Sequence, residues 1–469
     1  MITACYVKSN SGPKTALPMS IVNNVDVIVI GAGNAGLAAA SVAKEAGWSV
    51  LVVESRDAGG TCPIRGCVPK KVLVAAAEAL DVINNAAGHG IEVSKPKLNW
   101  SALIEREQGF VEGVSESIEA SLKRREIGYV KGHARFVDRH IVAVGDERYE
   151  GRKILVATGS TPRTLAIPGA EFLITSEHLL SSPELPESIV FIGGGVIAME
   201  LAHVLVRAGT KVTILERGER PLPALDADAV EHLVTHSEAL GIKFLRNAVL
   251  TAVTKSDAGL VVQYEQAGVS HELIAEAVAN TSGRVANIEG LGLDCAQVES
   301  DGNRVMLDEQ GRSTSNPSIF FAGDVLPSTP QLSPLATREG RVVGRQIVGL
   351  DAAPLNYMAN PSAVFTLPAL AQVGRTEAMA KSEGLDFRVV ENDMSTWRSA
   401  RTYLEKTTYA KVLIENGSNR ILGAHLLGHG SQETIHAFAF AIQHGLASES
   451  LADAAYAYPT FHSDLKYLL

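Results

Sequence analysis

The stretch VDVIVIGAGNAGLAAASVAKEAGWSVLVVES, residues 25–55, decides the fold. Its apolar, β-branched run at 25–30 predicts a buried parallel strand, which an alanine-rich helix and a second strand at 50–53 follow. Three glycines separate the first strand from the helix in the spacing G-x-G-x-x-G: Gly31, Gly33 and Gly36. Such glycines allow the backbone to approach a pyrophosphate closely, and Glu54 can accept a hydrogen bond from a ribose hydroxyl. We therefore predict a dinucleotide-binding unit rather than a simple tight turn.

Residues 188–220 repeat this pattern. Strands are predicted at 188–192 and at 211–215, and Glu216 follows the second of them. The glycine motif here has the form G-x-G-x-x-A and consists of Gly193, Gly195 and Ala198. The chain is therefore expected to bind two dinucleotides.

A third stretch, residues 315–340, contains another predicted strand at 318–322, which Gly323 and Asp324 follow. Ser333 is predicted to cap a helix and Pro334 to be its first residue. The positive end of that helix would face an electron-rich group. A separate helix is predicted at 99–125 from apolar residues at helical spacing.

Composition narrows the possible classes of protein. A length of 469 residues suggests about three domains. A net charge of −10 argues against a nucleic acid or an acidic membrane surface as a partner. No apolar run approaches the ~18 residues that a membrane span needs. Residues 1–20 lack the features of a signal peptide and are predicted to form a flexible tail.

Two of the four cysteines lie in GGTCPIRGCVPKK, residues 59–71. Residues five apart in a regular helix are separated by ~7.5 Å along its axis, whereas a disulfide needs Cα atoms within ~7 Å, so Cys62 and Cys67 cannot bridge across a regular helix. The neighbouring prolines and glycine predict an irregular start to a helix, with Cys67 near its positive end, which favours a thiolate. The other two cysteines are isolated, so we expect no zinc or other metal site. Such a close pair is expected to be catalytic, in the reducing cytoplasm.

These motifs, together with ATG at 157–159, AGD at 322–324 and VFTLPALAQVGRTE at 364–377, give the chain a family resemblance. From about Val25 onward it resembles the class I pyridine nucleotide–disulfide oxidoreductases, the group of glutathione reductase, dihydrolipoamide dehydrogenase and mercuric reductase. The resemblance implies an α/β fold with two Rossmann-like domains and a C-terminal α+β domain that forms a homodimer. The predicted ranges are 1–20 for the tail, 21–165 and 284–348 for the FAD-binding domain, 166–283 for the NAD(P)-binding domain and 349–469 for the dimerisation domain.

The same resemblance implies roles for individual residues. NAD(P)H would reduce FAD, FAD would reduce a Cys62–Cys67 disulfide, and the Cys62 thiolate would attack an acceptor by thiol–disulfide exchange. Either Lys70 or Lys71 would pair with Glu200 near the flavin. Further FAD contacts are implied at Gly60, Thr61, Thr158, Gly159, Gly323, Asp324 and, through the helix after it, Ser333.

The C-terminal sequence YAYPTFHSDLKYLL departs from the family pattern. Active disulfide reductases of the family carry a His–Glu pair from the partner subunit there, but Tyr458 occupies the histidine position. A phenol pKa near ~10 is poorly matched to proton transfer at neutral pH. His462, about one helical turn on, and the nearby Asp464 are a candidate substitute, although His462 could equally be an ordinary surface histidine.

The sequence leaves two questions open: which molecule accepts the electrons, and whether NADH or NADPH supplies them. Arg65, between the cysteines, could lower the pKa of the Cys62 thiol, attract an anionic substrate, or simply face solvent. Glu216 favours NADH over NADPH, although Arg217 and Arg220 could bind a 2′-phosphate. We expect a reductase of a small-molecule disulfide. The alternatives are a flavoprotein that reduces a quinone or a metal ion, and a redox sensor or scaffold without enzymatic activity.

Overall fold

A computed structural model describes residues 22–301, 304–327 and 329–469, so the predicted N-terminal tail lies outside the described residues. The chain divides into two compact units. The first comprises the described residues up to Arg65 with Val111–Thr161 and Arg284–Leu355, and the second comprises Gly66–Phe110, Pro162–Gly283 and Asn356–Leu469. The chain crosses from one unit to the other between Arg65 and Gly66, so residues 66–110 group with the second glycine motif rather than the first. Each unit is described by itself.

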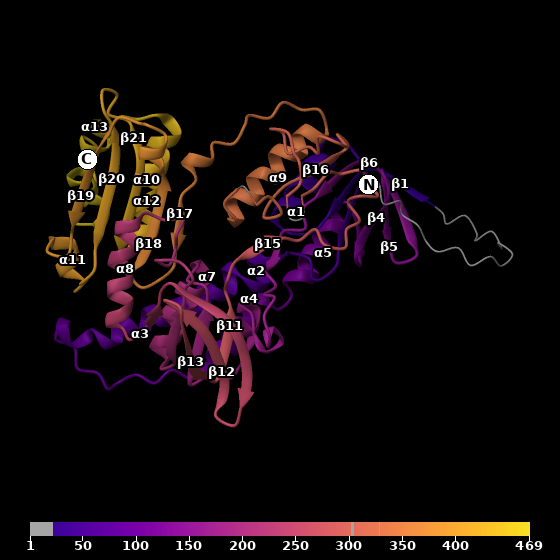
Figure 1. The fold of residues 1–469 in the computed structure, drawn as a ribbon. Coiled ribbons are helices and arrows are strands. Elements are labelled where there is room, and N and C mark those ends of the chain that lie inside the picture. Colours follow the sequence, from indigo (N-terminus) through magenta and orange to yellow (C-terminus); the bar gives the residue numbers. More distant parts are fainter. Residues whose placement is uncertain (1–21, 302–303, 328) are drawn as a thin grey trace. The chain divides into compact units, whose positions relative to one another are not determined.

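The first unit is built on one mixed sheet (Figure 1). Its strands in spatial order are β3 (Gly128–Lys131), β2 (Val50–Glu54), β1 (Val22–Ile30), β6 (Glu147–Val156), β5 (Ile141–Val144) and β4 (Ala134–Asp138), and β16 (Ile319–Phe321) also pairs with β6. The strands from β3 to β6, and β16, pair in parallel, and β5 and β4 are antiparallel. The strands predicted in the first and third stretches, β1, β2 and β16, thus lie in one sheet. Their continuous apolar sequences suit strands that are buried on both faces of a sheet.

Two helices of this unit, α1 (Asn34–Glu45) and α9 (Ser333–Ile347), pack directly against each other (Figure 1). The contact is close because small residues face each other: a Cβ at Gly340 would lie 2.1 Å from the Ala35 carbonyl oxygen. At Gly344 it would lie 3.0 Å from the Cα of Ala39. Glycines in α9 thus bring the N-terminal ends of both helices to one place.

The single helix predicted at 99–125 is wrong. Residues Trp100–Val111 form α4 and Val114–Arg124 form α5, because Gly113 between them adopts a left-handed backbone with φ 75° that ends regular helix. The remaining short elements of the first unit are α2 (Thr61–Arg65), β7 (Ser160–Pro162), whose last residue belongs to the second unit, and β15 (Arg284–Ala286).

The second unit contains the repeated dinucleotide fold, a small antiparallel sheet and several helices. The parallel sheet has the order β10 (Lys243–Leu245), β9 (Lys211–Leu215), β8 (Ser188–Ile192) and β14 (Ala277–Asn280). The antiparallel sheet has β11 (Ala248–Ser256), β12 (Gly259–Gln266) and β13 (Val269–Ala275). The helices are α3 (Cys67–Asn84), α6 (Ser176–Ser181), α7 (Val196–Ala208), α8 (Ala227–Ala239) and the 3-10 turns at Ala86–His89 and Ala170–Phe172. Helix α3 packs on α7, with Val72, Leu73 and Ala77 in the core that the two helices share.

The C-terminal part of this unit is a five-stranded antiparallel sheet. Its order is β17 (Ser362–Val364), β18 (Ala369–Gly374), β21 (Ile421–Gly428), β20 (Tyr409–Glu415) and β19 (Phe387–Asp393). Its helices are α10 (Glu377–Ser382), α11 (Arg398–Thr402), α12 (Ser431–His444), α13 (Ser448–Ala452) and the 3-10 helices at Tyr357–Ala359 and, termed η4, Phe461–Tyr467. Within the described ranges, none of the helices combines the length and the apolar character that a membrane crossing requires.

A buried lysine joins α8 to this sheet. Lys411 of β20 is 1% exposed, and its ammonium contacts Glu377 at 2.5 Å, Asp226 at 3.4 Å and Asp228. Asp226 also caps α8 by accepting from two of its first backbone N–H groups. A buried cation is tolerated when carboxylates compensate it, so this cluster holds the nucleotide-binding and C-terminal parts of the unit together.

The glycine contact between α1 and α9 generates a stability prediction. Gly340→Ala should destabilise the protein by about 1–3 kcal/mol, because the new methyl group would overlap the backbone of α1. Gly109→Ala in α4 is the matched control: no atom lies within 4 Å of its added Cβ, so it should stabilise by about 0.5–1 kcal/mol. Denaturant unfolding of the three proteins checks both signs. Equal effects of the two substitutions would contradict the packing argument.

Candidate functional site

The first glycine motif is shaped by close backbone contacts. Gly31 has φ 110°, and a Cβ there would lie 2.3 Å from the Ala157 carbonyl oxygen. At Gly36 a Cβ would lie 2.0 Å from the Gly31 carbonyl oxygen. Gly33 differs, since a Cβ there would be 3.9 Å from its nearest neighbour, the Cα of Gly60. Two of the glycines thus permit the turn, and the third leaves the surface of the α1 N-terminus open to a ligand.

A glutamate at the end of the second strand is oriented by two backbone hydrogen bonds in each unit, Glu54 in the first and Glu216 in the second. The Glu54 carboxylate accepts from the Ala32 N–H at 2.8 Å and from the Arg56 N–H at 2.8 Å. The Glu216 carboxylate accepts from the Gly194 N–H at 2.7 Å and from the Gly218 N–H at 2.6 Å. In each case the donors are the second residue of the glycine motif and the residue two past the acid. The duplication therefore extends to the hydrogen bonds that orient the carboxylate.

The start of α9 corrects one prediction. Ser333 is the first residue of the helix and Pro334 the second, whereas Leu332 occupies the N-cap position. The Ser333 hydroxyl instead accepts from the Asn34 side-chain amide, which also donates to the Ser333 carbonyl oxygen at 3.3 Å. Asn34 opens α1, so this contact fastens two helix N-termini to each other and aims two positive ends at one region of the first unit.

A buried hydroxyl and a desolvated carboxyl group lie in this unit. The buried hydroxyl of Thr158 makes no hydrogen bond to any described residue, and the adjacent Gly159 has φ 68°. Gly323 donates its N–H to the Glu339 carboxylate at 2.8 Å. Burial raises the pKa of Asp324, with the Arg284 charge opposing the rise. A buried hydroxyl and a desolvated acid are groups that a polar cofactor would pair with.

Cys62 lies half-buried in α2, one residue after Thr61. Arg65 closes the same helix, and its guanidinium contacts the Asp57 carboxylate at 3.3 Å; its side chain is only 13% exposed. Lys131 reaches the other oxygen of Asp57 at 3.5 Å. Arg65 is therefore not a solvent-facing residue, and part of its charge is compensated by Asp57.

Cys67 is the exposed first residue of α3, an 18-residue helix whose N-cap is Gly66. One turn on, the Lys70 ammonium contacts the Glu200 carboxylate at 2.7 Å, and both side chains are largely buried. Lys71 instead pairs with Glu78 at 3.1 Å in a more exposed position. Of the two lysines, the structure thus places Lys70 beside Glu200.

Sequence reasoning missed Phe365. Its backbone N–H donates to the same Glu200 oxygen at 2.9 Å, and its ring centre lies 4.1 Å from the Lys70 ammonium and 4.7 Å from that of Lys71. The phenylalanine belongs to the quoted stretch at 364–377, but the interaction uses its backbone. A backbone donor carries no residue-specific signal in a sequence.

The predicted His462–Asp464 pair is not formed. Tyr458 precedes the 3-10 helix η4 rather than lying one α-helical turn before His462; it is 66% exposed and accepts from Arg398 at 2.8 Å. The His462 ring packs against Tyr456, 5.7 Å between centroids, and the Asp464 carboxylate accepts from Ser399. Burial lowers the pKa of His462 and raises that of Asp464, so burial disfavours the charged form of each group and opposes an ion pair between them.

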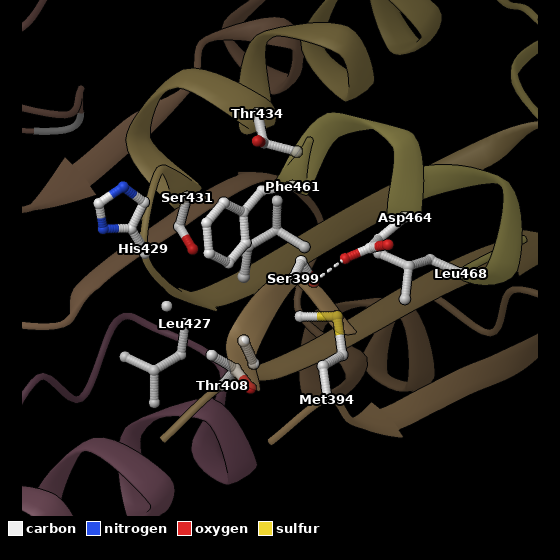
Figure 2. A pocket seen from close by; sticks show the side chains of 13 residues that line it. Met394, Ser399, Thr408, Leu427, His429, Ser431, Thr434, Phe461, Asp464 and Leu468 are labelled. Atoms are coloured by element: carbon white, nitrogen blue, oxygen red, sulfur yellow. Dashed lines mark hydrogen bonds between the residues drawn. The ribbon is translucent and has the colours of Figure 1, made fainter. Parts of the chain in front are cut away.

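A pocket beside this segment is too small for a substrate. Figure 2 shows it between α11, η4 and the start of α12, with the Ser399–Asp464 hydrogen bond at one side and Thr408 at another. Its volume of about 30 Å³ accommodates about one water molecule. This pocket is therefore not a candidate substrate site.

Comparison with protein families matches residues 25–340 to the pyridine nucleotide-disulphide oxidoreductases and residues 360–468 to their dimerisation domain. The chain belongs to this family. It is 32% identical to a glutathione reductase from Nostoc sp., over 90% of this chain and 94% of that protein. It is 30% identical to a mitochondrial dihydrolipoyl dehydrogenase from Pisum sativum, over 94% and 90%, and 30% identical to a leghemoglobin reductase from Vigna unguiculata, over 94% and 86%.

Membership confirms the fold class, the two dinucleotide-binding domains and the C-terminal dimerisation domain. The protein is an oxidoreductase acting on sulfur groups, and members of its family use FAD and NAD(P)H. The residues of the first unit fit FAD, because Gly33 leaves the α1 N-terminus open and Thr158 lacks a partner among the described residues.

Asp324 generates a prediction with a definite pH dependence. Since burial raises its folded-state pKa, the charged form costs stability once the pH exceeds the ordinary aspartate value of ~3.9. Asp324→Asn should therefore raise the melting temperature of the flavin-free protein at pH 7, should give no gain near pH 3, and should weaken FAD retention.

Asp308 is the control, because its pKa is shifted in the opposite direction and its substitution should change the melting temperature in the opposite sense. Burial alone would raise its pKa, but hydrogen bonds from Arg312 and Gln310 lower it overall. Its charge thus adds stability that is lost as the pH falls, and Asp308→Asn should lower the melting temperature at pH 7 only. Melting curves of both variants across this pH range decide the matter; a loss of stability in Asp324→Asn at pH 7 would refute the argument.

Proposed function

We propose that this protein passes electrons from NAD(P)H through FAD to a Cys62–Cys67 disulfide and on to a small-molecule disulfide. The observation that carries the proposal is the arrangement around Cys67. It opens a long helix whose positive end favours a thiolate, and the buried Lys70–Glu200 ion pair lies one turn away. Family membership supports the two cofactors.

The chain's own residues would act as follows. Gly31, Gly33, Glu54, Thr158 and Asp324 would hold FAD, and, in the second unit, the second glycine motif with Glu216 would hold the nicotinamide nucleotide. When bound, FAD accepts a hydride from NAD(P)H and delivers the two electrons to the cysteine disulfide.

The reduced pair would then perform two exchanges. The Cys62 thiolate attacks one sulfur of the substrate disulfide, which forms a mixed disulfide and releases one thiolate. The Cys67 thiolate attacks Cys62 sulfur, which reforms the protein disulfide and releases the second thiolate. Each released thiolate takes one proton, so one disulfide, one NAD(P)H and one proton give two thiols and NAD(P)⁺.

A second candidate function follows from the C-terminal segment. Tyr458 replaces the expected histidine, and neither His462 nor Asp464 forms a pair that could carry the proton. General acid catalysis is typically worth about 10²–10⁴-fold, so a quinone or a metal ion, which needs no proton on a leaving sulfur, is the alternative acceptor. One relative is named for a haem-protein acceptor, leghemoglobin.

Two further statements are part of the proposal. The matched dimerisation domain supports a homodimer. The close cysteine pair suits a reducing compartment, and we infer the cytoplasm.

A panel of disulfides, quinones and metal ions tests the acceptor. If exchange is the route, Cys62→Ser should lose nearly all disulfide turnover, because the attacking thiolate is removed. Cys67→Ser is the matched control, which leaves the Cys62 thiol for alkylation but cannot resolve the mixed disulfide. Full activity of Cys62→Ser on the best acceptor would reject exchange and favour the quinone or metal reductase.

The nucleotide preference is a separate prediction. The Glu216 carboxylate would repel a 2′-phosphate, and the Arg220 guanidinium is occupied by the carbonyl oxygens of Leu222, Pro223 and Leu225 at 3.0 Å each. One uncompensated like-charge contact costs about 1.4 kcal/mol or more, so KM should be about tenfold lower for NADH than for NADPH. Initial rates with each nucleotide measure this, and a lower KM for NADPH would overturn it.

A further inference from the structure

One face of α7 holds one short segment of chain at three points. Glu200, His203 and Arg207 are spaced by three and four residues, so they lie along one side of the helix. All three bond to residues 365–367, which connect β17 to β18. Only the first of them, through Lys70, is part of the site described above.

The hydrogen bonds of His203 define its tautomer. Two donors face Nδ1, the Leu367 N–H at 3.1 Å and Arg207 Nη1 at 3.3 Å, so we assign the lone pair to Nδ1. The Leu367 carbonyl oxygen, also 3.1 Å from Nδ1, then accepts from Arg207 instead. Nε2 carries the proton and donates to the Ser237 hydroxyl, 2.8 Å away, which donates in turn to the Leu233 carbonyl oxygen at 2.7 Å. The ring is fully buried, and that burial, with the neighbouring Arg207 charge, lowers its pKa. Neutral His203 is therefore a fixed acceptor for the Leu367 backbone.

Arg207 completes the clamp on the same residue, Leu367. Its guanidinium donates to the Leu367 carbonyl oxygen at 2.9 Å, to the His203 carbonyl oxygen at 3.0 Å and to Asp81 of α3 at 2.8 Å. Leu367 is thus held by its N–H and by its carbonyl group from two successive turns of one helix. Asp81 also compensates the buried arginine charge, which keeps α3 against α7.

The clamp acts on the Lys70–Glu200 pair through Phe365, two residues before Leu367. The Phe365 N–H fixes the Glu200 oxygen that Lys70 contacts, and the Phe365 ring lies beneath the Lys70 ammonium. Both groups that surround the ammonium therefore depend on where residues 365–367 lie.

We propose that His203 is a positioning residue for Lys70: its neutral imidazole fixes the Leu367 backbone, and through Phe365 it fixes the ammonium against Glu200. This inference rests on the proposed function for the importance of Lys70, but the positioning itself is measurable without turnover. Lys71 provides an internal reference on the same helix, because its ion-pair partner is Glu78 and only its 4.7 Å contact with the Phe365 ring involves the clamped segment.

The experiment compares the flavin-loaded, full-length wild type with His203→Leu and His203→Asn. Leucine keeps an apolar volume but removes both hydrogen bonds, whereas the asparagine Oδ1 can replace Nδ1 as the acceptor for the Leu367 N–H. The readout is the rate at which acetic anhydride labels Lys70 relative to Lys71, measured by mass spectrometry of peptides. We expect His203→Leu to raise this ratio several-fold and His203→Asn to restore it toward the wild-type value.

An unchanged ratio in folded His203→Leu would overturn the proposal, as would equal ratios in the two variants. General loosening of the fold would accelerate both lysines and leave the ratio constant, so it would also count against positioning. If His203→Leu does not fold, Ser237→Ala, which leaves the Nε2 proton unpaired, should raise the ratio in the same direction. A changed ratio together with a failed disulfide panel would reject the proposed function while the positioning stands.

Discussion

The buried carboxylate of Glu200 is the constraint on which the arrangement around Cys67 depends. One of its oxygens accepts from Lys70 and from the Phe365 backbone, so segments 130 and 165 residues away along the chain converge on a single atom. A buried ion pair contributes little by itself unless its remaining hydrogen bonds are satisfied. Here the additional backbone donor satisfies the carboxylate, and α7 supplies both the acid and the clamp that holds this donor.

The two glycine motifs also use backbone N–H groups to hold a carboxylate. Each places an acid at the end of a second strand and orients it with two backbone N–H groups, one from the glycine turn and one from just beyond the acid. The orientation of each carboxylate is therefore fixed by the chain itself, and under the proposed function it would be set before a nucleotide binds. Such preorganisation reduces the ordering cost of binding.

In the C-terminal segment, the side chains expected to form a proton relay contact other residues instead of each other. Its tyrosine contacts Arg398, its histidine packs on Tyr456 and its aspartate accepts from Ser399, so each group of the expected proton relay has a local structural partner instead. The family fold and the changed relay are compatible, because the domain is stabilised by its sheet, by the buried Lys411 cluster and by Leu465 and Leu468 of this same segment, none of which is a group of the relay. The groups of the relay can therefore differ while the fold of the domain is kept.

Much of the architecture followed from local sequence. The strands at 188–192 and 211–215 were predicted with the bounds that the structure has, because continuous β-branched runs have few ways to be buried. The helix break at Gly113 was missed because apolar spacing continues across it, and only backbone geometry shows the left-handed glycine. Ser333 was misassigned as a cap for a similar reason, since its hydroxyl serves a residue 299 positions away.

The two dinucleotide folds could be read from the order of residues, because glycine spacing and strand hydrophobicity are local properties, and so could the cysteine pair, which lies within five residues. Tertiary structure alone decided that Lys70 rather than Lys71 contacts Glu200, that the Phe365 backbone shares this acid, and that His462 and Asp464 do not pair. These outcomes depend on where distant backbone atoms lie, and a backbone atom has no signature in the order of side chains.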